Sequence, residues 1–118
     1  VHDENANYLN GVSGNAGLFS TTRDLGKFCQ MLIDGGTQIL NQNSINQISN
    51  VYTKELNSSR GIGWIVLEDK SLYHTGFTGT AIRLNLKEKT YEILLTNRVH
   101  PDASNTDILE FRDKFYNF

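Results

Sequence analysis

The spacing of apolar residues predicts an amphipathic helix in the first third of the chain. Its apolar positions recur every three or four residues, at Leu25, Phe28, Cys29, Leu32 and Ile33. This period places them on one face of a helix. Thr21 followed by Asp24 matches a capping box, and Gly35-Gly36 ends the pattern. We therefore expect a helix that begins at Thr21 and ends before the glycine pair.

Two further segments complete the first half of the chain. Ser44 with Gln47 repeats the capping pattern and starts a shorter amphipathic helix, whose apolar positions are Ile45, Ile48 and Val51. Both helices are expected to pack on one face of the domain. Residues 1–20 are rich in glycine and asparagine and show neither a helical nor a strand period, so they predict a structured loop.

From residue 61 the apolar period becomes two, which is typical of strands. Ile62, Trp64 and Val66 share one side, and three β-rich runs follow at residues 72–75, 80–86 and 90–97. The short polar segment 87–89 joins the last two runs, so these runs predict an antiparallel meander. Residues 81, 83 and 85 alternate with the apolar residues 82, 84 and 86, which predicts one buried face and one wetter face.

The end of the chain predicts a closing helix on this sheet. Residues 104–107 form a capping region, and Ile108, Phe111, Phe115 and Phe118 follow at spacings of three and four. The element order predicts an α+β fold, with an antiparallel β-sheet flanked by helices and residues 1–118 forming a single domain.

Composition and charge restrict the partners. The 11 Lys and Arg residues against 13 Asp and Glu residues give a net charge of -2, so no basic excess supports binding to nucleic acid or anionic membranes. The apolar run 64–67 is far shorter than the roughly twenty residues that span a bilayer. A single cysteine excludes an intrachain disulfide and a cysteine-built metal site, and no cofactor is predicted. Because the first residue is valine rather than methionine, we expect a piece of a longer protein.

The segment His74-Thr75-Gly76-Phe77-Thr78-Gly79, between two predicted strands, is the most informative. It resembles the third active-site motif of the penicillin-recognising serine hydrolases, the superfamily of serine β-lactamases, D-alanyl-D-alanine carboxypeptidases and related esterases. That motif reads Lys-Thr-Gly in most members and His-Thr-Gly in some. Segments 11–25, 61–64 and 94–97 agree with the superfamily in order and spacing. Four separated segments make the resemblance specific and extend it over nearly the whole chain.

The resemblance implies roles for four consecutive residues at the edge of an active site. His74 and Thr75 would face the cleft and bind or polarise a carboxylate or carbonyl group of the substrate. Gly76 would permit close approach of the substrate. The backbone N–H of Phe77 would be one of two oxyanion-hole donors, the other belonging to the nucleophilic serine. The substrate would be a small acyl compound, a peptide or a β-lactam, in the bacterial cytoplasm or cell envelope.

The resemblance also shows what the chain lacks. The superfamily's nucleophile lies in a Ser-x-x-Lys motif, and no serine here is followed three positions later by lysine. Tyr8-Leu9-Asn10 spells the second motif, Tyr-x-Asn, but stands where the superfamily has a loop well past its own tyrosine, so we interpret it as coincidence. The chain is interpreted as the C-terminal portion of a hydrolase that acts through a serine ester, with a partial β-lactamase/transpeptidase-like fold and no activity by itself.

Two other functions stay open: a non-catalytic binding or interaction module that retains the fold, and an esterase of the same superfamily. An upstream Ser-x-x-Lys followed by Tyr-x-Asn would distinguish enzyme from module. The resemblance further implies that the run 90–97 pairs on its far side with a strand from the N-terminal end of the parent chain. We therefore expect the missing N-terminal portion, or a second copy, to cover this edge.

Other candidate residues have structural explanations. The segment 11–15 lacks the final glycine of a nucleophile elbow and is expected to be loop. Cys29 lies on the apolar face of its helix and is expected in the core. His2-Asp3-Glu4 with His100 could ligate a metal, but no second spaced pair supports this, so solvated loop residues are expected. His74 alone could be a strand histidine bonded to its neighbours, and its context favours the active-site role.

Overall fold

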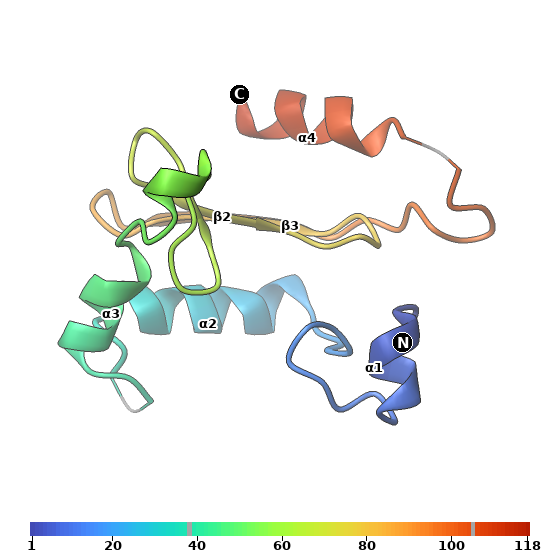
Figure 1. Ribbon diagram of the computed structural model, residues 1–118, viewed down its shortest axis with the longest axis horizontal. Helices are drawn as coiled ribbons and strands as arrows, with labels where there is room; N and C mark the ends of the chain where they lie inside the picture. Colours follow the sequence, from blue (N-terminus) through green and yellow to red (C-terminus); the bar gives the residue numbers. More distant parts are fainter. Residues whose placement is uncertain (38, 105) are drawn as a thin grey trace.

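The computed structural model describes residues 1–37, 39–104 and 106–118 and arranges them in layers (Figure 1). The helices are α1 (Glu4–Tyr8), α2 (Thr22–Ile33), α3 (Gln42–Ile48), the 3-10 turn η1 (Lys54–Leu56) and α4 (Ile108–Tyr116). The strands are β1 (Ile65–Val66), β2 (Leu72–Thr75), β3 (Ala81–Asn85) and β4 (Thr90–Leu94). Helix α2 lies on one face of the sheet and α4 on the other (Figure 1). This confirms the predicted α+β fold with an antiparallel sheet flanked by helices.

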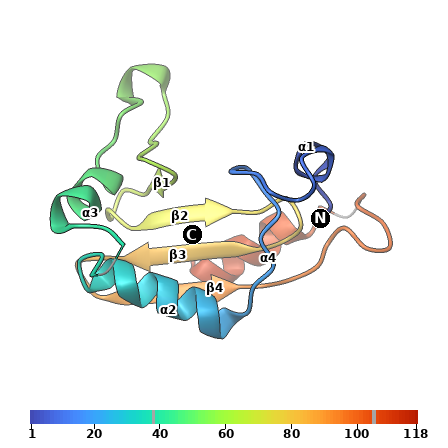
Figure 2. The same ribbon diagram turned by 90° about the horizontal axis from the view of Figure 1, so that it is seen from below.

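The sheet is a meander in the order β1-β2-β3-β4, with antiparallel neighbours. Tyr73 lies opposite Arg83, and His74 lies opposite Ile82. Figure 2 shows β4 at one outer edge and the short β1 beside the start of β2. Strand β1 is shorter than the predicted run from residue 61, because Gly61 N–H donates to the Trp64 carbonyl (N···O 2.9 Å) and folds residues 61–64 into a turn.

Both faces of the sheet carry a hydrophobic cluster. The cluster toward α2 and α3 contains Cys29, Leu32, Ile45, Val66, Leu72 and Leu84. The cluster toward α4 contains Tyr73, Ala81, Leu94 and Tyr116. The face of β3 that carries Ala81 was expected to be the wetter one. This is wrong at the start of the strand, where Ala81 is only 2% exposed because α4 covers it. The shared cluster confirms that α2 and α3 pack on one side.

Side-chain caps account for the starts of α1, α2 and α3. Thr21 caps α2 and accepts a hydrogen bond from Asp24 N–H (3.2 Å), as predicted. The cap of α3 is Asn41 rather than Ser44, whose N–H donates to the Asn41 side chain (2.9 Å) from within the first turn. Residues 1–20 were predicted as loop but contain α1, which Asp3 caps. A five-residue helix is too short to show a hydrophobic period.

Helix α4 lies on the sheet as predicted, but with a different face inward. Its buried residues are Ile108, Arg112 and Tyr116, one turn apart from each other. The predicted stripe of phenylalanines is instead largely exposed, with Phe111 at 49% and Phe115 at 40%. The arginine can be buried because backbone carbonyls of the turn between β2 and β3 accept its hydrogen bonds. In the described ranges, no helix is both long and apolar enough to cross a bilayer.

Candidate active site

The His-Thr-Gly segment lies at the end of β2, on a strand edge that is partly open. β1 pairs with Leu72 and Tyr73, and within the described residues no strand pairs with that side of His74 and Thr75. His74 is exposed and Thr75 is half-buried. Both predicted substrate-binding side chains thus lie at an accessible edge.

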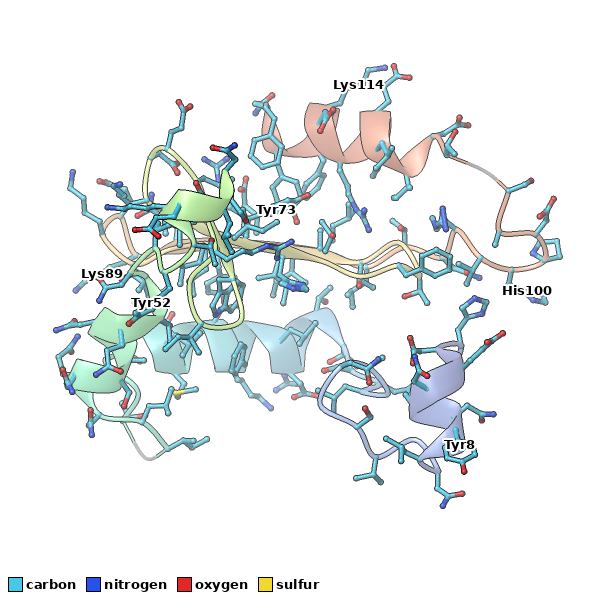
Figure 3. The ribbon with its side chains drawn as sticks, in the orientation of Figure 1. Tyr8, Tyr52, Tyr73, Lys89, His100 and Lys114 are labelled. Atoms are coloured by element: carbon cyan, nitrogen blue, oxygen red, sulfur yellow. The ribbon has the colours of Figure 1, made fainter. Side chains whose placement is uncertain are left out.

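The two side chains leave the strand on opposite faces, because side chains alternate along a β-strand. Tyr73 packs edge-on against Tyr116 of α4, with ring centroids 5.3 Å apart, so Thr75 shares the α4 face and His74 the opposite one. Figure 3 shows Tyr73 between the sheet and α4. A ligand that contacts both side chains must therefore lie along the open edge rather than over one face.

The His74 ring makes no hydrogen bond with any residue in the part of the chain that the structure describes. A strand histidine with a structural role would be expected to bond to its neighbours. The exposed, unbonded ring is available to a ligand instead.

The turn after the motif is held through its carbonyl groups. The main-chain N–H of Arg98 donates to the Thr78 carbonyl (3.1 Å), and its Nε donates to the Phe77 carbonyl (2.8 Å). The Thr96 hydroxyl donates to the Gly79 carbonyl (2.6 Å). The segment that follows β4 thus holds one side of the turn.

The remaining two carbonyls of the turn are bound from α4. Arg112 Nη2 donates to the carbonyls of Gly76 (2.7 Å) and Thr80 (2.9 Å). Gly76 N–H also donates to the Thr80 carbonyl (2.8 Å), and Gly79 N–H donates to the Gly76 carbonyl (3.1 Å). All five carbonyls from residue 76 to residue 80 therefore accept hydrogen bonds, and the turn is fixed in place.

The N–H of Phe77 differs from these groups because it has no acceptor among the described residues. A fixed backbone donor without an internal partner can serve an external acceptor. This is the arrangement expected of one oxyanion-hole donor.

The glycines of the turn lie close to neighbouring atoms. A Cβ on Gly76 would collide with the Thr80 hydroxyl. Gly79 has a φ of +113°, and a Cβ there would meet the backbone and hydroxyl of Thr96. Gly76 thus has a structural role in addition to the close substrate approach that we predict for it.

The Phe77 side chain lies between two residues that sequence reasoning did not connect with it. Its ring is 66% exposed and stacks on His2, with centroids 5.7 Å apart. The Arg98 guanidinium carbon lies 4.3 Å from the centroid of the same ring. No local pattern in the sequence signals these contacts, because the three residues are far apart along the chain.

In the described ranges, no cluster of three or more His, Cys, Asp or Glu side chains is placed to hold a metal. Asp3 instead caps α1, accepting from Ala6 N–H (2.8 Å), and this backbone hydrogen bond is the main cause of its lowered pKa. A hydrogen bond from the Asn15 side chain (3.1 Å) lowers the pKa further.

Three other candidates lie where the sequence places them. Cys29 is fully buried in the core, and burial raises the pKa of its thiol to about 11, so it is no nucleophile at neutral pH. Residues 11–15 form an exposed loop without a following helix. Tyr8 is 87% exposed and lies on α1 turned away from the sheet (Figure 3).

Comparisons with known proteins agree on one family. The family model described as Beta-lactamase matches residues 1–115. The chain is 29% identical, over 126 aligned residues, to proteins named "Putative D-alanyl-D-alanine carboxypeptidase" from Salmonella paratyphi B, Salmonella newport and Salmonella heidelberg. Each alignment covers 92% of this chain and 29% of the relative, so the chain spans less than a third of the length of these relatives. No solved structure matches.

Proposed function

The chain belongs to the Beta-lactamase family of serine hydrolases, and on this premise we propose that it forms the C-terminal portion of an enzyme that transfers acyl groups through a serine ester. The observation that carries the proposal is the Phe77 N–H. It follows the His-Thr-Gly segment directly, has no acceptor among the described residues, and lies in a turn whose carbonyls are all bound.

In this proposal each residue of the motif acts on the substrate. The Phe77 N–H donates to the carbonyl oxygen as it gains negative charge during attack by the serine. His74 and Thr75 bind a polar group of the substrate from the two sides of the strand edge. Gly76 keeps the edge free of a side chain, so that an extended substrate can lie against the strand.

The nucleophile is proposed to lie elsewhere in the longer protein. No Ser-x-x-Lys sequence occurs in these 118 residues, and the named relatives are more than three times as long. Their name favours a peptide that ends in two D-alanines over a β-lactam or a simple ester. Hydrolysis of such a peptide would form an acyl-serine with release of D-alanine, and water would then cleave the ester.

The test compares the full-length protein with this chain expressed alone. Each is incubated with a fluorescent penicillin, a short-chain p-nitrophenyl ester and a D-alanyl-D-alanine peptide. We expect the full-length protein to be labelled at one serine outside these 118 residues and to turn over at least one substrate. The chain alone should show neither reaction.

The control is the full-length protein with alanine in place of the labelled serine. Stoichiometric acylation of a serine within these 118 residues would contradict the proposal. A full-length protein that binds the peptide without labelling or turnover would identify the chain as part of a binding module instead.

A further inference from the structure

We propose that Arg112 is a positioning residue for the Phe77 N–H, which it orients and strengthens as a hydrogen-bond donor. This inference rests on the proposed acyl-transfer function, in which that N–H is an oxyanion-hole donor. Arg112 lies on α4, 35 positions after Phe77, and among the described residues its hydrogen bonds reach the His-Thr-Gly segment only at the Gly76 carbonyl.

Arg112 is a buried cation, with 8% of its surface exposed. Within the described residues it forms no ion pair, and its charge is met by the carbonyls of Gly76 and Thr80 at 2.7 and 2.9 Å. Among the described residues, its buried Nε has no hydrogen-bond partner. Because burying an arginine is costly and an apolar side chain could pack there, this residue is poorly explained by stability alone.

The peptide group between Gly76 and Phe77 transmits the effect of Arg112. This peptide is trans, so its C=O and N–H point in opposite directions in one plane. A guanidinium that fixes the Gly76 carbonyl therefore also fixes the direction of the Phe77 N–H. The positive charge on the carbonyl side polarises the peptide, and a polarised peptide is a stronger N–H donor.

The test substitutes Arg112→Met in the full-length protein. We expect kcat for an ester substrate to fall about 10- to 100-fold, less than the roughly 100- to 1,000-fold loss on removing an oxyanion-hole donor. KM should change little, because the interaction strengthens only as charge develops on the oxygen. Arg112→Lys should restore part of the loss, since an ammonium group can also donate to carbonyls.

Arg83→Met is the matched control. Arg83 also lies beneath α4, where its Nη1 donates to the Tyr116 carbonyl (3.1 Å), but among the described residues no hydrogen bond or ion pair joins it to the turn. If Arg112 acted only by holding α4 on the sheet, both variants would lose the same activity, and the proposal would be overturned. We expect Arg83→Met to retain activity within a few fold.

The activity ratio between an oxygen ester and the corresponding thionoester should not change if Arg112 has only a structural role. Sulfur accepts hydrogen bonds more weakly than oxygen, so an enzyme that depends on an oxyanion hole prefers the oxygen ester. Arg112→Met should reduce this preference, and an unchanged preference would contradict the proposal.

The Phe77 amide provides a measurement that is independent of activity. With ¹⁵N-phenylalanine labelling, Arg112→Met should shift the Phe77 amide resonance strongly and the Phe28 resonance in α2 little. If the wild-type protein proves inactive, the proposed function fails but this shift still tests the geometry. A Phe77 resonance that does not move would refute the role of Arg112 in either case.

Discussion

The rings of His2 and Phe77 lie face to face, with centroids 5.7 Å apart and planes inclined by 20°. This stack joins the start of the chain to the turn that follows β2. α1 lies near the end of the sheet where β2 runs into β3 (Figure 2). The stack therefore links the N-terminal segment to the candidate site. A substitution in either of them should alter the mobility of the other.

His2→Ala should loosen the N-terminal segment with little effect on global stability. The stack is partly exposed, since Phe77 is 66% exposed, so we expect a loss of about 0.5 kcal/mol or less. Hydrogen exchange followed by mass spectrometry should show faster exchange over residues 4–8. Tyr8→Ala serves as control, because this side chain is 87% exposed and should leave exchange unchanged. Equal exchange in wild type and His2→Ala would show that the stack does not hold the segment.

His74→Ala should lower the activity of the full-length enzyme while leaving folding intact. The ring is exposed and bonds to no described residue, so its removal leaves no buried group unpaired. Loss of one hydrogen bond to a charged substrate group corresponds to about a tenfold to hundredfold decrease in kcat/KM. Steady-state kinetics and thermal unfolding would be measured together. Unchanged turnover with a lowered melting temperature would support a structural histidine.

Thr75→Val tests the second polar contact at the same edge. The change keeps the side-chain shape and removes the hydroxyl, so kcat/KM should fall roughly threefold to tenfold. The loss should be larger for substrates with a carboxylate than for neutral esters. An equal loss for both substrate types would show that the hydroxyl does not recognise the carboxylate.

The His-Thr-Gly turn illustrates how far the sequence could be interpreted. The two strands that flank the motif were predicted correctly, because strand periodicity and turn glycines are local signals. The hydrogen bonds from Arg112 to the Gly76 and Thr80 carbonyls were not predicted, because they join residues 36 and 32 positions apart. A charged residue at this position also interrupts the apolar pattern of the helix. The phenylalanines at helical spacing predicted the wrong inward face for α4, because the face that packs on the sheet contains the buried Arg112. The hydrophobicity pattern does not show that the carbonyls of Gly76 and Thr80 accept hydrogen bonds from Arg112.

The Asp69 carboxylate should make stability depend on pH in the acid range. It accepts hydrogen bonds from Ser71 N–H (2.9 Å), the Ser71 hydroxyl (2.8 Å) and Arg83 (2.7 Å). The backbone hydrogen bond from Ser71 is the largest cause of its lowered pKa. Because the folded-state pKa lies below the ordinary value of 3.8, the stabilisation is complete above about pH 4 and is lost as pH falls through the folded-state pKa.

Asp69→Asn should remove this dependence. Urea unfolding between pH 3 and pH 7 should show a difference from wild type at neutral pH that shrinks toward pH 3. The difference should stay below about 1 kcal/mol, because the Asp69 side chain is 45% exposed and its ion pair is screened by solvent. A difference that grows as the pH falls would contradict the assignment.

The outer edge of β4 leads to a prediction about assembly. Among the described residues, β4 pairs with β3 alone and forms one end of the sheet. Tyr91 is 40% exposed and Leu95 38% exposed, while Glu92 carries the one charge of the strand. An unpaired edge that carries exposed apolar side chains is a template for another strand. The exposed Phe111 on α4 adds apolar surface nearby.

We therefore expect the 118-residue chain alone to self-associate through β4, and the N-terminal portion of the full-length protein to suppress this by covering the edge. Sedimentation equilibrium of the chain should show concentration-dependent association. Leu95→Lys should weaken it, because a charge at the edge opposes strand addition, whereas Leu109→Lys, at a 62% exposed position on α4, should not. A monodisperse monomer at high concentration, with slow amide exchange along residues 90–97, would show that the edge is already covered within this chain.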